Sequence, residues 1–414
     1  MAKASIITIG DELLIGQVID TNSAWMATEL NKAGIAVQRR VAVGDNRKDI
    51  LDALDQEKSA SEIILLTGGL GPTSDDITKP LLCEYFGGKL VLNNEVLEQI
   101  RQLFANIHRR PTTERNIKQA EVPDNCRVIM NLRGTAPGMW FEKDGRIFIS
   151  MPGVPHEMKG IMEQAIPMLR EKFNTEPIFH KTLVTAGIGE SLLADLIAPI
   201  EESLPAYIKL AYLPRQGMVR LRLTASGSNP ELEQELEKRF TMLKKGVEDY
   251  LVTDRDEPLE AVVGRLLQEK GKTICTAESC TGGYISQLIT SQPGSSAYYE
   301  GSFITYSYHS KEKLLCVPHE MLEAKGAVSE EVVLFMAEGA LSNLGADYVI
   351  AVSGILGPGG GTPEKPVGTV WMAIGHKGKI QAYQHQFRFD RKRNMEMTAQ
   401  QALNHLRMCL LESA

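Results

Sequence analysis

The sequence predicts an α/β protein with two parallel-sheet domains joined by a smaller α+β module. Three observations predict this class. The first 90 residues alternate short apolar runs with amphipathic stretches, as strands and helices do in a parallel sheet. The same alternation resumes after residue 255, whereas residues 173–254 have a different order of elements. At 414 residues the chain is also long enough for two or three domains.

The N-terminal domain is expected over residues 1–172. Its strand, helix, strand, helix, strand order follows the segments SIITIG, DTNSAWMATELNKAG, IAVQRRVAVG, RKDILDALDQ and IILLTGG. Residues 95–120 then have helical periodicity and a local excess of Arg and Lys. The segment RIFISMPGVP returns to a strand that ends in a Pro/Gly turn, and the domain is expected to close near residue 172.

The central module, residues 173–254, begins with the strand KTLVTAGIG and the amphipathic helix ESLLADLIAPIEE. A strand pair around AYIKLAYLPRQGMVRLRLTAS and a Glu-rich helix follow. The polar segment TDRDEP separates this module from a C-terminal domain over residues 255–414. There a helix, LEAVVGRLLQEKG, leads into the strand KTICTAE, and the strands ADYVIAVSG and GTVWMAIG precede a final helix.

Composition excludes several classes of protein. The formal charge of −7 argues against a protein that coats nucleic acid through bulk charge. The six cysteines form no CxxC pair and no regular framework, so neither a zinc knuckle nor a disulfide scaffold is expected. The N-terminus lacks the pattern of a signal peptide, and no apolar stretch reaches the 18 residues of a membrane span. We therefore expect a cytoplasmic protein with no membrane partner.

Polar residues and glycines follow two strands of the C-terminal domain. Ser279, Thr281, Gly282 and Gly283 form a turn between the strand KTICTAE and a helix. Such a turn offers backbone N–H groups and hydroxyl donors to a phosphate, although it equally fits a helix cap and a tight turn. A second glycine-rich loop with Gly354 and Gly357 follows ADYVIAVS. Because carboxyl ends of strands border the ligand crevice, the two loops are expected to converge.

A serine and a lysine between these loops could carry hydrolysis of an amide without metal. The segment GSSAYYEGSFITYSYHSKEK places Ser295 and Ser296 in a loop, Tyr306 near a strand end, and Lys311 beyond it. A desolvated lysine with a lowered pKa can activate a serine as histidine does elsewhere. The plainer alternative makes Lys311 part of a solvated helix start, and His309, a competing base, is expected to be an exposed histidine without a catalytic role.

The motifs AESCTGG, GSS…TYS…K and SGI.GP…KPVGTVW resemble the C-terminal domain of the CinA family over about residues 258–411. Stand-alone versions of that domain deamidate nicotinamide mononucleotide (NMN). The resemblance implies a serine amidohydrolase with a Ser/Lys dyad and no cofactor. It maps onto Lys311 with Ser296 or Ser279, supported by Tyr306 and Arg391. Ser296 is favoured as the nucleophile, which leaves the other candidates to bind substrate: Ser279, Thr281, Gly282, Gly283, Gly354 and Gly357.

Five acids stand at or just after strand ends of the N-terminal domain: Asp11, Glu12, Asp45, Asp75 and Asp76. Acids gathered at the carboxyl edge of a parallel sheet suit a divalent metal that bridges a diphosphate. The nearby glycines Gly68, Gly69 and Gly71 would let phosphates approach the backbone, and Lys79 could neutralise one of them. Each acid taken singly is as well explained as a helix cap or a solvated turn residue.

The segments LTGGLGPTSDDIT and MPGVPHEM resemble the molybdopterin-binding fold of molybdenum-cofactor biosynthesis enzymes. Asp76 takes the place of the aspartate that lines the pterin site there, and Asp45 that of a second one. However, GDELLIGQ.DTN and GLGPT.DD belong to the CinA version, which implies hydrolysis of ADP-ribose to AMP and ribose 5-phosphate. That reaction implies a divalent metal ion, with or without a monovalent cation. Leu70 stands where the cofactor enzymes carry Thr, which counts against pterin chemistry.

The family's central module is likened to a KH domain. A KH clamp on nucleic acid needs a GXXG loop, but Gly187-Ile188-Gly189 is one residue short and the module's second helix is acidic. We expect a spacing role and no nucleic acid partner. The interpretation of the whole chain is a homodimeric, bifunctional enzyme of pyridine-nucleotide salvage that acts on NMN and ADP-ribose. The alternatives are a non-enzymatic competence or DNA-damage partner and a molybdenum-cofactor enzyme.

Overall fold

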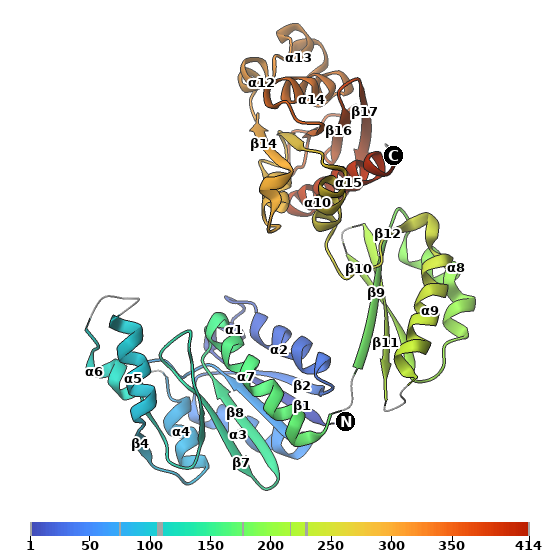
Figure 1. Ribbon diagram of the computed structural model, residues 1–414. Coiled ribbons are helices and arrows are strands. Elements are labelled where there is room, and N and C mark those ends of the chain that lie inside the picture. Colours follow the sequence, from blue (N-terminus) through green and yellow to red (C-terminus); the bar gives the residue numbers. More distant parts are fainter. Residues whose placement is uncertain are drawn as a thin grey trace. The chain divides into compact units, whose positions relative to one another are not determined.

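The computed structural model describes residues 2–73, 76–105, 111–175, 178–215, 217–227 and 231–412. The chain divides into two compact units (Figure 1). The first contains residues 1–179 and 225–232, and the second contains residues 180–224 and 233–414. Each unit is described separately below.

The first unit is built on a six-stranded sheet with the order β2-β1-β3-β8-β7-β6 (Figure 1). Strands β2, β1, β3 and β8 run parallel, while at one edge β7 pairs antiparallel with β8 and β6 pairs antiparallel with β7. The parallel sheet that the sequence predicts is therefore confirmed. The strands are β1 (Lys3–Ile9), β2 (Ala36–Val43), β3 (Ile63–Thr67), β6 (Arg127–Ile129), β7 (Gly138–Lys143) and β8 (Arg146–Met151).

Helices cover both faces of this sheet, so its central strands are buried on both sides, as in other parallel sheets. On one face Met26 and Met158 pack against Ile6, and on the other Leu54 packs in a cluster with Ile7. Asp20 caps the second helix through the amide of Ser23. The helices are α1 (Asp11–Leu14), α2 (Thr21–Lys32), α3 (Arg47–Ala60), α4 (Thr78–Tyr85) and α7 (Pro155–Phe173). A smaller group contains β4 (Leu90–Leu92), α5 (Asn94–Leu103), α6 (Glu114–Gln119) and β5 (Glu121–Pro123).

The central module lies in the second unit and has a four-stranded sheet with the order β10-β11-β9-β12. Residues of β11 alternate between buried and partly buried positions, as in a sheet with one covered face. The strands are β9 (Ile178–Ala186), β10 (Ile208–Arg215), β11 (Met218–Ser226) and β12 (Leu251–Thr253), and the helices are α8 (Glu190–Glu202), α9 (Leu232–Gly246) and the 3-10 turn η2 (Glu248–Tyr250).

The C-terminal domain has a five-stranded sheet with the order β14-β13-β15-β16-β17. Strands β14, β13 and β15 are parallel, β16 runs antiparallel to β15, and β17 runs antiparallel to β16. Ile274 faces one apolar core and its neighbour Cys275 faces the other, because successive side chains of a strand point to opposite faces. The strands are β13 (Ile274–Glu278), β14 (Tyr299–Ile304), β15 (Tyr348–Gly354), β16 (Thr369–His376) and β17 (Lys379–Gln386).

Two groups of helices bury these two faces and complete an α/β domain of three layers. One face is covered by α10 (Leu259–Lys270), α11 (Tyr284–Thr290) and α15 (Arg391–Glu412), and the other by α12 (Tyr308–Leu315), α13 (His319–Lys325) and α14 (Glu330–Leu344). A short 3-10 turn, η3 (Ser295–Ala297), precedes β14. None of the helices in the described ranges is long and apolar enough to cross a membrane.

Candidate active sites

Ser279 and Lys311 form a buried pair in the C-terminal domain. The Nζ atom of Lys311 donates to Ser279 Oγ at 2.9 Å and to the carbonyl oxygen of Thr305 at 2.6 Å. The Lys311 side chain is fully buried, and Ser279 is 8% exposed. Burial lowers the pKa of Lys311 to about 8, because the charged ammonium is poorly solvated there. A lysine with this pKa is partly neutral near physiological pH and can act as a base toward the serine.

The sheet brings these two residues together. Strands β13 and β14 run parallel with Glu278 opposite Ile304, and the amide of Thr305 donates to the Glu278 carbonyl oxygen at 2.9 Å. Both strands therefore end at the same edge. Ser307 then caps α12 by accepting from the amide of Ser310 at 3.1 Å. Lys311 follows in the first turn of that helix, which returns it to the end of β13.

Glu278 holds the turn that follows β13. Its buried carboxylate accepts from the backbone amides of Gly283, Ile285 and Ser286 at 2.8–3.1 Å and from the hydroxyls of Thr281 and Ser286 at 2.7 Å. The expectation that this helix start offers its amides and the Thr281 hydroxyl to a phosphate is therefore wrong, because an internal carboxylate already takes them. An acid directly before a Ser/Thr/Gly turn could have indicated such a cap.

The first two backbone amides after Ser279 remain open. No oxygen in the described part of the chain accepts from the amides of Cys280 and Thr281. An open amide directly after a serine that ends a strand is the arrangement that forms an oxyanion hole in other acyl-transfer enzymes. Burial raises the pKa of the Cys280 thiol to about 12, which keeps it protonated and excludes it as the nucleophile.

Arg391 and Tyr306 meet beside the second glycine-rich loop. Arg391 donates to the carbonyl oxygen of Gly357 at 2.7 Å and to the Tyr306 hydroxyl at 3.1 Å. Gly354 approaches the Ser279 turn closely, since a Cβ atom there would lie 3.2 Å from Cys280 Sγ. Gly282 and Gly283 have positive φ angles of 61° and 98°, which favour glycine. The structure thus brings the two predicted loops together with Lys311.

The preference for Ser296 as nucleophile needs correction. Ser296 is exposed in η3, directly before β14, and Ile274 at the start of β13 lies opposite Tyr299 at the start of β14. Ser296 therefore lies at the opposite edge of the sheet from Lys311, and Ser279 replaces it as the candidate nucleophile. The alternative of a solvated lysine is also wrong for Lys311, although it holds for the exposed Lys313.

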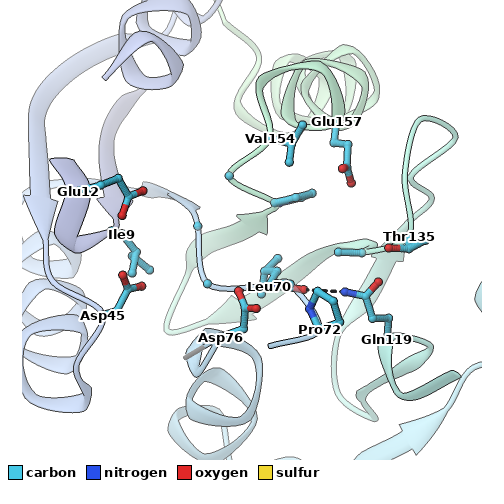
Figure 2. A pocket seen from close by; sticks show the side chains of 17 residues that line it. Ile9, Glu12, Asp45, Leu70, Pro72, Asp76, Gln119, Thr135, Val154 and Glu157 are labelled. Carbon is cyan, nitrogen blue, oxygen red and sulfur yellow. Dashed lines mark hydrogen bonds between the residues drawn. The ribbon is translucent and has the colours of Figure 1, made fainter. Parts of the chain in front are cut away.

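The first unit has a cavity of about 390 Å³ at the carboxyl edge of its sheet (Figure 2). The loop Gly68–Gly71 lines it together with Glu12, Asp45 and Asp76. Gly68 and Gly69 have φ angles of 119° and 64°, so the loop requires glycine at both positions. A Cβ atom at Gly71 would lie 2.5 Å from Asp76 Oδ2.

The predicted acids that the structure describes do not form a metal cluster. Asp76 accepts from the amides of Gly71 and Thr73 at 2.7 and 2.9 Å, and so closes the glycine loop. Asp11 and Asp45 bind each other's backbone amides at 3.1 and 3.2 Å, and Asp11 does not line the cavity. Among the described residues no three His, Cys, Asp or Glu side chains are placed to hold a metal ion. Asp75 lies outside the described residues.

Lys79 does not face the cavity, contrary to expectation. Its Nζ atom donates to the carbonyl oxygens of Lys118 and Gln119 at 2.8 and 3.4 Å, and burial lowers its pKa to about 8. The cavity instead has a carboxylate that the sequence interpretation missed. Glu157 lines the cavity from α7. Its segment MPGVPHEM carries the fold resemblance, but nothing in that resemblance indicates a role for this acid.

Comparisons with known proteins cover the whole chain. Residues 5–171 match the family described as probable molybdopterin binding domain, residues 180–251 match the damage-inducible protein CinA KH domain, and residues 256–410 match the CinA C-terminal domain. The turn Gly187–Gly189 lies between β9 and α8 of the KH match.

Similar full-length proteins have CinA names. A CinA-like protein from Cytophaga hutchinsonii is 47% identical over 99% of this chain and 98% of its own length, and one from Flavobacterium psychrophilum is 44% identical over 97% of both. A crystal structure of a competence-damaged protein (CinA) superfamily protein from Klebsiella pneumoniae is 36% identical, covers 37% of this chain and 96% of its own, and gives a TM-score of 0.37. The chain belongs to the CinA family.

Proposed function

We propose that the C-terminal domain hydrolyses NMN to nicotinate mononucleotide and ammonia. The observation that carries this proposal is the 2.9 Å contact between Ser279 Oγ and the buried Nζ of Lys311. A serine paired with a lysine that is partly neutral near physiological pH is sufficient for amide hydrolysis without a metal. The family resemblance indicates which amide is cleaved, namely the carboxamide of the nicotinamide ring in NMN.

The proposed chemistry begins when neutral Lys311 takes the hydroxyl proton of Ser279. Ser279 Oγ attacks the carboxamide carbon, and the open amides of Cys280 and Thr281 stabilise the negative oxygen that forms. Lys311 then returns the proton to the departing nitrogen, which leaves as ammonia. Lys311 then takes a proton from water, the hydroxide attacks the acyl carbon, and the bond to Ser279 Oγ breaks. Lys311 returns the proton to Ser279 Oγ, and nicotinate mononucleotide is released.

Arg391 is the proposed recognition group for the phosphate of NMN. Because Glu278 occupies the start of α11, the phosphate needs another positive group. The guanidinium of Arg391 is held by Gly357 and by Tyr306, and Tyr306 is exposed enough to meet a ligand. An arginine can bind phosphate through two parallel hydrogen bonds.

The test is release of ammonia from NMN by the full-length protein in a chelator. Lys311→Met should slow release roughly 10²–10⁴-fold, because it removes the base and keeps the apolar stem. Lys313→Met is the matched control, since Lys313 lies on the same helix and is exposed. No release by the wild type would overturn the proposal and favour the alternative of a non-enzymatic competence or DNA-damage partner.

A second activity is proposed for the first unit, namely hydrolysis of ADP-ribose to AMP and ribose 5-phosphate. The observation that favours it is the cavity that joins the glycine loop Gly68–Gly71 to three carboxylates, Glu12, Asp45 and Asp76. Glycines permit a diphosphate to approach the backbone. Leu70 continues to count against molybdenum-cofactor chemistry.

A divalent metal ion is part of this second proposal. Carboxylate oxygens suit a hard cation, so Glu12, Asp45 and Asp76 are the residues that would hold it. The described side chains are not gathered as a ligand set in the structure, so they would have to move closer together around the ion. When bound, the ion would neutralise diphosphate charge. Cleavage of ADP-ribose that stops in a chelator would support this proposal, and full activity in the chelator would overturn the metal requirement. A homodimer also stays a prediction, which sedimentation of the full chain would test.

A further inference from the structure

Glu157 is a carboxylate on the wall of the N-terminal cavity, in the first turn of α7. Figure 2 shows it on the side of the cavity away from Glu12 and Asp45, with Asp76 and the glycine loop between them. It therefore stands apart from the acids that we propose for the metal. Its side chain is half-buried, and burial raises the pKa of the carboxyl group.

The loop 131–136 is shaped around this carboxylate. Asn131 Nδ2 donates to Glu157 Oε2 at 2.6 Å and to the Ala136 carbonyl oxygen at 2.9 Å. A Cβ atom at Gly134 would lie 2.0 Å from Oε2, so a larger residue at this position would displace the carboxylate from its observed place. Gln99 of α5 holds the loop in place, because its Nε2 donates to the Asn131 carbonyl oxygen at 2.6 Å.

One carboxylate oxygen remains open. Oε2 is held by Asn131, whereas Oε1 accepts no hydrogen bond from any described residue. No cation of the described chain lies within ion-pair distance of Glu157, in contrast to Glu163 one to two turns further along α7, which pairs with Arg133 at 2.6 Å. Burial raises the pKa of Glu157 and the neighbouring His156 lowers it by a smaller amount, but His156 forms no ion pair with Glu157 among the described residues. A fixed carboxylate with one free oxygen and no ion-pair partner, on the wall of a cavity, is suited to accept a proton.

We propose that Glu157 is the general base of the N-terminal cavity, a role that rests on the proposed hydrolysis of ADP-ribose. Water attacks one phosphorus of the diphosphate, and its proton passes to Oε1 of Glu157. The bond from that phosphorus to the bridging oxygen breaks, and the bridging oxygen leaves with the electron pair as part of the second phosphate monoester. Glu157 then releases the proton to solvent.

The experiment compares full-length Glu157→Gln and Glu157→Ala with the wild type, and uses Glu171→Gln, an exposed acid near the other end of α7, as the matched control. We expect kcat for ADP-ribose to fall roughly 10²–10⁴-fold in both Glu157 variants, the usual contribution of a general base. Affinity for ADP-ribose, measured by calorimetry, should stay near that of the wild type. Added formate should partly restore Glu157→Ala and leave the wild type unaffected, because it can occupy the space of the missing carboxylate.

Circular dichroism and denaturant unfolding of the same samples show whether each variant is folded, because NMN deamidation reports on the second unit alone. Unchanged kcat in Glu157→Gln would overturn the inference, and so would loss of ADP-ribose affinity together with kcat, or no effect of formate on Glu157→Ala. These results differ from failure of the proposed function itself. In that case the wild type would neither bind nor cleave ADP-ribose, and the role of Glu157 would fall with it.

Discussion

Ser279 Oγ lies 2.9 Å from Lys311 Nζ, although 32 residues separate the two in the sequence. The contact is buried, and within the described part of the chain the lysine makes one other hydrogen bond, to the carbonyl oxygen of Thr305. A carbonyl oxygen does not neutralise an ammonium. The surroundings therefore favour the neutral amine, the form that can take a proton from the serine.

Replacement of the two candidate serines distinguishes their roles. Ser279→Ala should abolish ammonia release from NMN, whereas Ser296→Ala should retain nearly the wild-type rate, because Ser296 lies at the other edge of the sheet. The double variant Ser279→Ala with Lys311→Met should be no slower than Ser279→Ala, since members of one catalytic unit are strongly non-additive. An inactive Ser296→Ala with an active Ser279→Ala would reverse the assignment.

The pH profile of NMN deamidation should follow Lys311. Burial lowers the pKa of this lysine to about 8, so the amine is protonated below that pH and neutral above it. The base is needed neutral, and kcat/KM should rise with pH and level off above about 8. In Lys311→Met the remaining rate should be roughly 10²–10⁴-fold lower and should lose this dependence. A wild-type profile that falls as the pH rises through this pKa would contradict the role of Lys311 as a base.

Glu278→Gln should weaken both the fold and the C-terminal reaction. Glutamine keeps the shape but has one acceptor oxygen where the carboxylate has two, so buried amides among Gly283, Ile285 and Ser286 lose their partner. A buried donor left unpaired costs about 1–3 kcal/mol, and more where a charged acceptor is lost. Denaturant unfolding should show this loss, while Glu300→Gln, an exposed acid on β14, should not. Equal stability of Glu278→Gln and the wild type would mean that this carboxylate does not hold the turn.

Periodicity predicts most of the helices and strands, but it does not predict the site. The pairing of Lys311 with Ser279 depends on the parallel register of β13 and β14 and on the cap of α12 at Ser307. Neither is visible as a hydrophobic pattern. The sequence interpretation assigns Ser279 and its turn to the substrate and so favours Ser296, but a motif does not say which edge of the sheet each serine occupies. Glu278 lies at the end of a predicted strand, and its hydrogen bonds to the following turn depend on the folded backbone.

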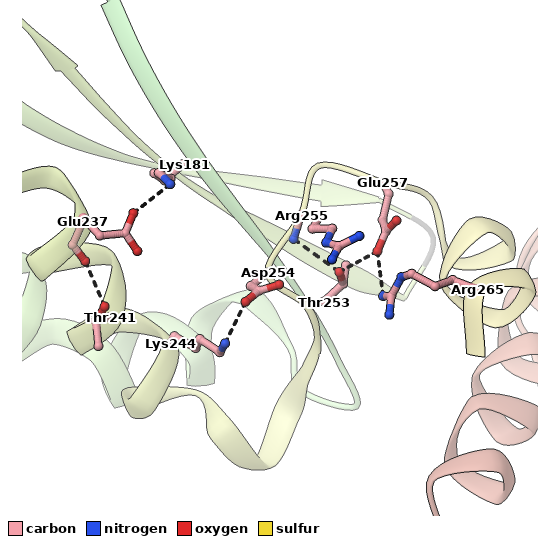
Figure 3. A network of polar contacts seen from close by, with 9 residues as sticks. All are labelled: Lys181, Glu237, Thr241, Lys244, Thr253, Asp254, Arg255, Glu257 and Arg265. Atoms are coloured by element: carbon pink, nitrogen blue, oxygen red, sulfur yellow. Dashed lines mark hydrogen bonds and ion pairs between the residues drawn. The ribbon is translucent and has the colours of Figure 1, made fainter. Parts of the chain in front are cut away.

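The polar segment TDRDEP illustrates the same limit (Figure 3). Its composition indicates a break between elements, but its side chains are well partnered. Asp254 binds Lys244 of α9 at 2.7 Å, and Glu257 accepts from Arg265 of α10 at 2.9 Å and from the Thr253 hydroxyl at 2.8 Å. A run of polar residues therefore does not distinguish a loose linker from a hydrogen-bonded turn, because the partners lie on other elements.

Asp76 provides the test of the metal in the first unit. We expect EDTA to abolish ADP-ribose cleavage and to leave NMN deamidation unchanged, because metal chemistry is assigned to the first unit alone. Asp76→Asn should also lower cleavage, but for two separable reasons. The substitution removes a charge from the cavity. It also leaves a single acceptor oxygen for the amides of Gly71 and Thr73, each of which donates to its own carboxylate oxygen in the wild type.

A metal titration separates these two effects. If Asp76 is a ligand, Asp76→Asn should need more divalent ion for half-maximal cleavage, because an amide oxygen binds a hard cation less strongly than a carboxylate does. If Asp76 only shapes the glycine loop, the ion requirement should be unchanged and KM for ADP-ribose should rise. Asp52→Asn is the control, since Asp52 pairs with Lys48 on the surface of α3. Full activity of Asp76→Asn at the wild-type ion requirement would exclude both roles and would direct the search for ligands to Glu12 and Asp45.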